Sequence, residues 1–390
     1  MSNPVSTTAD LEPACIEQEL RGLWAKLAAE KNTTIPLIKK NAVNLIAIVA
    51  DSKGAAAANT AVAALSGRHP GRFITIVLHP DKGVCHNKEN VSPQCALTLA
   101  CSADTCYEHI VIPDIPGQNT NLPQLAKPLL HDELPVILWW RYPFHPEEPL
   151  FQAFSAIADQ VILDSVTMQN PQNGFTKILE LLRSRKNAGV QDINWTRLTP
   201  WRVALAGLYD LAAYRPFLDK ITHIEIKYSH QLSRHQLINN SQVLLLFGWL
   251  ASRLGWCLSS GITEEQSGQL YRISAVSGSN QPIICRFRVF AAASHQEAGL
   301  KQICLTAWGT QQANFSITLC QDNQHLQTRI SLPENSPPEK ITRLEVGSEI
   351  DLVTNGMTSG TPDSVYQQTL EYLGGNTILW KFGEDRDTVS

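Results

Sequence analysis

The turn after the first buried strand of the sequence is the first place to look for chemistry. It reads VADSKGAAAANT over residues 49–60 and holds a single glycine, Gly54. A dinucleotide site needs G-x-G-x-x-G there, and a nucleoside triphosphate site needs G-x-x-x-x-G-K-[ST]. Lys53 stands beside the start of the next helix, where a helix N-terminus can meet an anion. A solvated turn lysine is the simpler interpretation.

Acid–base and metal-binding residues form no recognisable constellation. The sequence has no G-x-S-x-G and no H-E-x-x-H motif, and its eleven histidines are scattered. His223 falls on the polar face of an alternating strand. Glu147 and Glu148 are adjacent, and successive positions rarely converge on one substrate atom. We therefore expect no catalytic residue, no metal and no cofactor, and expect that the chain is not an enzyme.

Four of the nine cysteines lie close together in the sequence. There is no C-x-x-C motif and no His/Cys spacing typical of a zinc site. The first residues lack a basic and apolar leader, so we expect a cytoplasmic protein whose thiols are mostly reduced. Clustering alone makes the group a candidate redox-responsive pair, whose members are Cys85, Cys95, Cys101 and Cys106.

Aromatic and arginine residues crowd two short stretches. One reads ELPVILWWRYPFHPEEPLF over 133–151, and the other reads DINWTRLTPWR over 192–202. Trp, Tyr and Arg anchor protein interfaces because they bury a large area at little cost in rotamer freedom. The same side chains can instead seal a junction between domains, and both alternatives stay open. The candidates for partner binding or a domain seam are Trp139, Trp140, Arg141, Tyr142, Phe144, Trp195, Arg197, Trp201 and Arg202.

Up to about residue 190, the elements that position these residues share one pattern of apolar residues. Nearly unbroken runs of Val, Ile and Leu, such as 44–50, 73–79 and 134–140, are typical of strands covered on both faces. Helical segments between the runs predict an α/β domain over 1–190, with a mostly parallel or mixed sheet and helices on both faces. The runs 94–102 and 108–113 are too close for a helical crossover, so part of this sheet should be antiparallel.

Residues 191–390 follow a second pattern, in which polar and apolar residues alternate. Clean alternation predicts an α+β domain with an antiparallel sheet that has one wet face. Over 283–289, for example, Arg286 and Arg288 face one way, while the apolar residues between them face the other. Helices are expected over 241–257 and 362–375.

Composition excludes several classes of protein. Hydrophobic content of 43% and charged content of 17% are typical of folded domains, and 390 residues favour two domains or three small ones. A net charge of -4 without a basic stripe gives no basis for nucleic-acid binding. The longest apolar run, within 243–251, is far shorter than the ~20 residues of a membrane-spanning helix.

The strand LPVILWWR and the later DINWTRLTPWR together resemble the bacterial OpcA family, the glucose-6-phosphate dehydrogenase assembly proteins. The resemblance extends more loosely over most of the chain. It implies a non-catalytic activator that binds glucose-6-phosphate dehydrogenase and favours its active oligomer, and so the NADP-linked entry to the oxidative pentose phosphate pathway. It implies no catalytic residues to transfer. Redox control of the dehydrogenase step would give the cysteine group a role.

Two other functions stay open. One is a sugar-phosphate or nucleotide binder that uses the crevice at the carboxyl end of the first sheet, with Lys53, Arg141 and Arg202 as anion ligands. The other is a structural scaffold for a different partner, in which the aromatic clusters are interdomain core.

Overall fold

The computed structural model divides the chain into two units. Unit 1 consists of Met1–Thr167, Leu181–Ile193 and Ser348–Pro362, and unit 2 of Met168–Glu180, Asn194–Gly347 and Asp363–Ser390. The sequence analysis places one boundary at residues 190–191. Two segments belong to the unit on the other side of it: Met168–Glu180 is part of unit 2, and Ser348–Pro362 is part of unit 1. The structure describes residues 5–31, 42–78, 94–102, 105–113, 122–145, 147–168, 170–184, 189–230, 241–259, 263–266, 270–291, 299–309, 311–334, 336–345, 347–358, 363–376 and 379.

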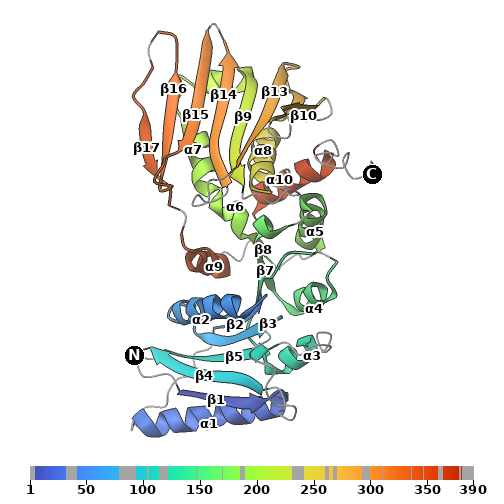
Figure 1. The fold of residues 1–390 in the computed structure, drawn as a ribbon, viewed down its shortest axis with the longest axis vertical. Coiled ribbons are helices and arrows are strands. Elements are labelled where there is room, and N and C mark those ends of the chain that lie inside the picture. Colours follow the sequence, from blue (N-terminus) through green and yellow to red (C-terminus); the bar gives the residue numbers. More distant parts are fainter. Residues whose placement is uncertain are drawn as a thin grey trace. The chain divides into compact units, whose positions relative to one another are not determined.

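The described part of unit 1 is built on an eight-stranded sheet in the order β1-β4-β5-β3-β2-β6-β7-β8 (Figure 1). The strands from β5 to β8 in this order are parallel, whereas β4 runs antiparallel to both β1 and β5. The predicted mixed sheet and the antiparallel pair are confirmed. The strands are β1 (Val5–Asp10), β2 (Val43–Val49), β3 (Gly71–Val77), β4 (Gln94–Ser102), β5 (Thr105–Pro113), β6 (Val136–Arg141), β7 (Gln160–Leu163) and β8 (Val190–Asp192).

Helices fill the connections between the parallel strands of unit 1. Every residue of β2 and β3 is buried, as their unbroken apolar runs predict. The alanine-rich α2 begins after Asp51, whose carboxylate accepts a hydrogen bond of 2.7 Å from the backbone N–H of Gly54. The helices are α1 (Pro13–Lys31), α2 (Ser52–Ser66), α3 (Leu122–Ala126), η2 (Lys127–Leu129), α4 (Pro149–Ile157) and η3 (Ser165–Thr167); α5 (Pro171–Ser184) and α6 (Ile193–Arg197) contain residues of both units.

One helix of unit 1 was not predicted. α9 (Glu349–Thr358) follows the second sheet in the sequence but packs its Leu352 and Val353 into the core of the first. Gln160 at the start of β7 donates a hydrogen bond of 2.6 Å to the carbonyl of Gly356 in this helix. A Cβ atom at Gly356 would collide with the side-chain amide of Gln191, so a larger residue there would require that amide to move.

The described part of unit 2 contains a nine-stranded sheet in the order β10-β12-β13-β9-β14-β15-β16-β17, with β11 paired to β12. Its pairs are antiparallel, as predicted, except that β9 and β13 run parallel. The strands are β9 (Ile221–His230), β10 (Cys257–Leu258), β11 (Thr263–Gln266), β12 (Leu270–Val276), β13 (Pro282–Ala291), β14 (Gly299–Trp308), β15 (Gln312–Leu319), β16 (His325–Ser331) and β17 (Lys340–Arg343).

Helices cover one face of the second sheet (Figure 1). Tyr209 of α7 packs on Phe315 of β15, with ring centroids 5.2 Å apart, and Phe247 of α8 packs on Phe287 of β13 at 5.3 Å. α8 ends at Arg253, earlier than the predicted residue 257, and Gly255 with φ of 63° follows it. The helices are α7 (Thr199–Tyr209), η4 (Arg215–Lys220), α8 (Ser241–Arg253) and α10 (Ser364–Gly375).

The other face of the second sheet is polar, and we call it the open face. On β9, Ile224 and Ile226 are buried under the helices, while the alternate residues His223, Glu225 and Lys227 are only half-buried. Residues at alternate positions of a strand point to opposite sides of its sheet. The open face therefore presents the polar half of the alternation that the sequence predicts.

Candidate functional site

The carboxyl edge of the first sheet, where α/β proteins commonly bind ligands, is closed by residues of unit 1 itself. Arg141 at the end of β6 donates from Nη1 to the carbonyl of Gly54, at 3.1 Å, in the turn after β2. Its Nε and Nη2 donate to the two carboxylate oxygens of Glu349 at 2.7 Å and 2.9 Å. An anion that bound to Arg141 would have to compete with the Glu349 carboxylate.

The three anion ligands proposed for the sheet crevice do not form one site within either unit. Lys53 is exposed, and Arg141 is held by Glu349. Arg202 belongs to unit 2, where its guanidinium stacks on the Trp195 ring at 3.6 Å from the centroid. The described contacts therefore place Arg141 and Arg202 in separate intramolecular clusters.

The first aromatic cluster is mostly buried. Every residue of β6 from Val136 to Trp140 is buried, as its nearly unbroken apolar run predicts. Trp139 and Trp140 are each 1% exposed, and neither indole nitrogen has a hydrogen-bond partner. Trp139 joins the core cluster under α9, whereas Trp140 packs edge-to-face on Phe151, with centroids 5.1 Å apart.

Two further residues of that cluster lie beyond the end of β6. Phe144 is buried and packs edge-to-face on Phe151 at 4.9 Å. Tyr142 is half-buried and packs on the edge of Trp140 at 6.1 Å. The chain thus folds the aromatic end of this strand back over its own core.

The second aromatic cluster holds the helices of unit 2 together. Trp195 of α6 is 4% exposed, and its indole N–H donates to the Asp363 carboxylate at 2.7 Å. Asp363 also caps α10 by accepting hydrogen bonds from Val365 and Tyr366, whose ring lies 5.2 Å from that of Trp195. Burial lowers the pKa of Arg202 to about 10, and the nearby Asp363 opposes this shift.

The remaining members of this second cluster differ in exposure. Trp201 is buried in α7, while Arg197 at the end of α6 is half-buried. Both tryptophans of this cluster, Trp195 and Trp201, are thus buried. Whether these clusters contact a partner or form a domain seam stays a prediction.

The four clustered cysteines have different environments. Cys95 is free and buried, and burial raises the pKa of its thiol to about 11, so little thiolate is present at neutral pH. Cys106 is disulfide-bonded. The backbone of Cys101 lies directly opposite Cys106 in the register of β4 and β5. Cys85 and the side chain of Cys101 lie outside the described residues.

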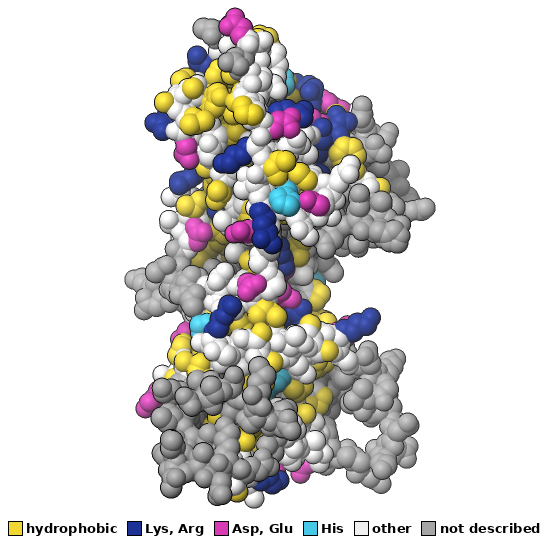
Figure 2. Space-filling view, turned by 90° about the vertical axis from the view of Figure 1, so that its left-hand side faces the viewer, with side chains coloured by type: hydrophobic (Ala, Val, Ile, Leu, Met, Phe, Trp, Pro, Cys, Tyr) yellow, Lys and Arg dark blue, Asp and Glu magenta, His cyan; other side chains and the backbone are white. Residues whose placement is uncertain are grey.

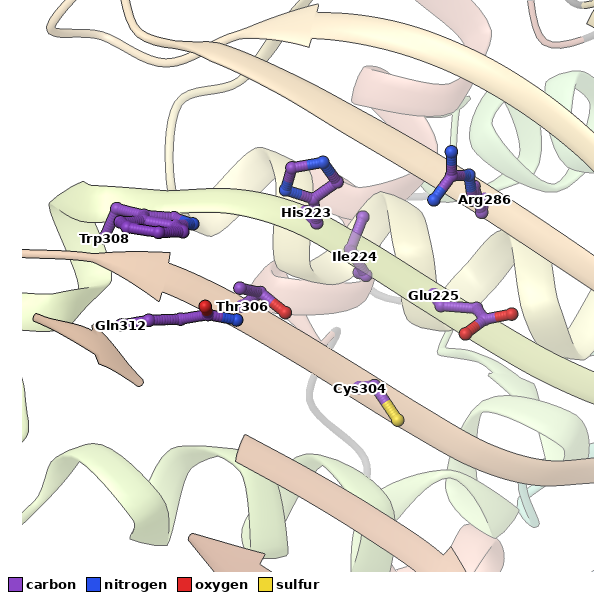
Figure 3. Close-up of a pocket in the computed structure, with 8 residues that line it drawn as sticks. All are labelled: His223, Ile224, Glu225, Arg286, Cys304, Thr306, Trp308 and Gln312. Atoms are coloured by element: carbon purple, nitrogen blue, oxygen red, sulfur yellow. The ribbon is translucent and has the colours of Figure 1, made fainter. Parts of the chain in front are cut away.

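A hollow on the open face of the second sheet is the site that sequence reasoning missed. Its volume is about 340 Å³. The sequence places His223 and Arg286 on polar strand faces, but only strand pairing brings them together. Figure 3 shows the lining side chains over neighbouring strands: His223, Ile224, Glu225, Arg286, Cys304, Thr306, Trp308 and Gln312.

Charge over the side of the molecule drawn in Figure 2 is mixed, with basic and acidic side chains interspersed among small hydrophobic groups. In the described ranges, no group of three or more His, Cys, Asp or Glu side chains is arranged to hold a metal ion. Of the helices in the described part of the chain, none has the length and apolar character that a membrane crossing requires.

Solved structures with a similar fold include two of KijD10, a 3-ketoreductase from Actinomadura kijaniata in complex with TDP-benzene and NADP. A single-residue variant of it has a TM-score of 0.52 and 8% identity, covering 88% of this chain and 98% of that chain. Its open conformation has a TM-score of 0.50 and 7% identity, covering 86% and 95%. At such identities the likeness shows the fold alone.

The curated relatives carry the name OxPP cycle protein OpcA, and only this name links them to the OxPP cycle. The protein from Nostoc punctiforme is 30% identical over 213 residues, which are 54% of this chain and 43% of the relative. The protein from Synechocystis is 27% identical over 236 residues, or 60% of this chain and 46% of the relative. The matched part of the chain thus spans less than half the length of these relatives.

Two family models match consecutive parts of the chain. Residues 62–180 match the model described as the glucose-6-phosphate dehydrogenase subunit N-terminal domain. Residues 188–370 match the model described as the C-terminal domain of the same subunit. The resemblance carried by the two tryptophan-rich segments is confirmed, and the chain belongs to the OpcA family of glucose-6-phosphate dehydrogenase assembly proteins.

Proposed function

We propose that this chain is a non-catalytic subunit that binds glucose-6-phosphate dehydrogenase and favours its active oligomer in the oxidative pentose phosphate pathway. The observation that carries the proposal is the match of two consecutive regions to the N-terminal and C-terminal domains described for a subunit of that enzyme. The names of the curated relatives, which refer to the OxPP cycle, support the same pathway.

The closed turn of unit 1 supports a binding role over a dehydrogenase role. A dinucleotide lies with its pyrophosphate against the first strand–helix turn of an α/β sheet, where glycines let it approach the backbone. In this chain that turn has one glycine, and the Arg141–Glu349 pair reaches its carbonyl group.

Activation then follows from differential binding. A protein that binds the active oligomer more tightly than the inactive form shifts the population towards the active one, by no more than the difference in binding free energy. A tenfold preference corresponds to about 1.4 kcal/mol. The effect is reciprocal, so substrates that favour the active oligomer should also tighten its complex with this chain.

The proposed contact residues are the partly exposed members of the two aromatic clusters. Trp139, Trp140, Trp195 and Trp201 are buried, so in the described conformation they can support a contact surface but not touch a partner. Tyr142 and Arg197 are half-buried and accessible in part. Substitution of Tyr142 or Arg197 by alanine should weaken binding of the dehydrogenase without unfolding either unit.

The test is dehydrogenase activity with and without the purified chain, together with the mass of the mixture by light scattering. The proposal predicts a rise in activity accompanied by a larger complex. Lys340→Ala on the exposed edge strand β17 is the matched control and should behave like the wild type. No change in activity or mass, under both reducing and oxidising conditions, would contradict the proposal.

Redox control of this activation is a separate part of the proposal. The disulfide at Cys106 and the register that places Cys101 opposite it support this pair as the responsive element. Cys101→Ser and Cys106→Ser should abolish any difference between reduced and oxidised samples in the activation assay. Cys257→Ser, at an exposed free cysteine, should retain the difference. A response that survives in both pair variants would exclude the pair.

A further inference from the structure

Two arginines lie directly opposite each other on neighbouring strands of the open face. Arg272 of β12 is the register partner of Arg286 of β13. Their side chains are 38% and 40% exposed, so both are partly withdrawn from water. Like charges placed directly opposite each other in an antiparallel pair are destabilising. Such a pair is costly unless an anion lies between or above the two guanidinium groups.

Among the described residues, the carboxylate that approaches both arginines does so only loosely. Glu265 approaches both arginines, but its oxygens lie 3.5 Å from Nη1 of Arg272 and 3.6 Å from Nε of Arg286. Those distances exceed the range of a good hydrogen bond. Nε of Arg286 is buried and has no hydrogen-bond partner. Glu225 on β9 is the register partner of Arg286 on its other side, and its carboxylate accepts a hydrogen bond of 2.8 Å from Arg288.

The adjoining histidine responds to the positive potential of the two arginines. Burial, followed by Arg286 and Arg272, lowers the pKa of His223. The imidazole is therefore neutral near pH 7, and its Nδ1 lies 3.0 Å from the hydroxyl of Thr222. A neutral imidazole in this position can exchange a hydrogen bond with a polar ligand without adding a further charge.

The hollow runs from Arg286 and Glu225 along β14, whereas Arg272 adjoins Arg286 without lining the hollow. Cys304, Thr306 and Trp308 occupy alternate positions and so cover about 13 Å along the strand. Trp308 is 54% exposed, and Gln312 is its register partner on β15. Figure 3 shows these two at one end of the hollow and Arg286 towards the other, with His223 and Thr306 between them. An aromatic face beside amide and hydroxyl groups suits the mixed polar and apolar surface of a sugar ring.

The size of the hollow restricts its occupant. Its volume of about 340 Å³ is at the lower end of the ~300–1,000 Å³ that is typical of small-molecule sites. This space suits one small ligand better than a dinucleotide. Arginine forms charge-assisted, frequently bidentate hydrogen bonds with phosphate, which makes phosphate the anion that the basic end would recognise best.

We propose that this hollow binds a small phosphorylated and hydroxylated molecule of the sugar-phosphate class, with its phosphate on Arg286, next to Arg272, and its ring beside Trp308. The site lies on the open face of the second sheet and is separate from the crevice of the first sheet. It does not depend on binding of the dehydrogenase, so the two proposals can fail independently.

The test is calorimetric titration of the full chain, in the absence of any partner, with three probes: inorganic phosphate, a hexose 6-phosphate and the unphosphorylated hexose. The hexose phosphate should bind more tightly than either of the other two. Arg286→Gln should weaken its binding about tenfold or more, since a hydrogen bond to a charged group is lost. Trp308→Ala should weaken binding of the hexose phosphate and leave inorganic phosphate unchanged.

Arg329→Gln is the matched control, because Arg329 is an exposed arginine on β16 that is paired with Glu339. It should bind all three probes like the wild type. Unfolding midpoints of all variants verify that each is folded. Equal loss of binding in the Arg286 and Arg329 variants would overturn the proposal, as would the absence of saturable binding of every probe. Equal affinities for inorganic phosphate and the hexose phosphate would overturn the sugar assignment.

Discussion

The polar groups of the first sheet and those of the second are paired in opposite ways. In unit 1, Arg72 and Glu108 are 2% and 1% exposed, and the Nε atom of Arg72 lies 2.7 Å from the Glu108 carboxylate. On the open face of unit 2, Arg272 and Arg286 are partly exposed, and Glu265 lies 3.5 Å and 3.6 Å from them. The first arrangement is complete without a ligand, whereas the second leaves hydrogen-bonding capacity unused.

This contrast teaches where to look for a site in a protein without catalytic motifs. Aromatic and arginine density in the sequence led to residues that stabilise each unit from within, such as Trp139 and Trp195. The place where charges are close but poorly paired lies on a plain alternating strand. The proposal of a ligand site therefore rests on incomplete pairing and not on residue composition.

Breaking the buried pair of unit 1 should have the largest effect. Arg72→Met leaves the Glu108 carboxylate buried without its main partner, although Trp24 still donates to it at 2.6 Å. We expect a loss of about 3–5 kcal/mol in the free energy of unfolding, measured by urea denaturation. The double variant Arg72→Met with Glu108→Leu should recover part of this loss. A loss below about 1 kcal/mol in the single variant would show that the pair is not a stabilising feature.

Acid should destabilise unit 1 through a buried histidine. Burial lowers the pKa of His109 from 6.5 to about 4, and its Nε2 lies 2.9 Å from the Thr75 hydroxyl. Between these two values the unfolded chain binds a proton that the folded chain does not, so stability is full above about pH 6.5 and falls as the pH drops towards 4. The contribution is about 3 kcal/mol over the window.

His109→Gln removes the titrating group at this position. Urea midpoints measured from pH 7 to pH 4 should therefore decline less steeply in the variant than in the wild type. If the urea midpoint of the variant declined with pH as steeply as that of the wild type, other groups would cause the acid sensitivity. His109 would then make no contribution to it.

The ion pair at the edge of the first sheet should have an intermediate effect. Arg141 is 19% exposed and Glu349 is 37% exposed, so water screens the pair in part. We expect Glu349→Gln to lower the free energy of unfolding by about 1 kcal/mol, since it removes the charge and keeps the shape. Glu339→Gln, at the more exposed pair with Arg329, should cost less. If both substitutions lowered the free energy of unfolding equally, the Arg141–Glu349 pair would be no different from an ordinary surface pair.

The smallest effect on stability is expected at the open face. Arg286→Gln relieves the repulsion from Arg272, so the free energy of unfolding should stay within about 0.5 kcal/mol of the wild type or rise slightly. Any rise should shrink with added salt, which screens exposed charges. A large loss of stability in Arg286→Gln would mean that this arginine is as structural as Arg72.

Much of the fold follows from the sequence because local patterns decide it. The unbroken runs of β2 and β3 predict strands covered on both faces, and the alternation in β9 and β13 predicts a sheet with one polar face. The close spacing of 94–102 and 108–113 predicts the antiparallel pair of β4 and β5. Each of these predictions depends only on neighbouring residues, and each is confirmed.

The site depends instead on which strands become neighbours. β9 lies between β13 and β14, so Glu225 has Arg286 on one side and Cys304 on the other, although these residues are far apart in the sequence. α9 escapes prediction in the same way, because the core that it completes is formed by residues much earlier in the chain.

The position of α9 in the sequence has a consequence for the synthesis of the protein. The core around Trp139 includes Leu352 and Val353, which leave the ribosome long after the eight strands of the first sheet. At ~5–20 residues per second, the interval between Ile193 and Glu349 is on the order of 8–30 s. During that time the surface that later receives α9 is exposed on the growing chain. We therefore expect nascent chains that end before α9 to depend on chaperones more strongly than the completed protein.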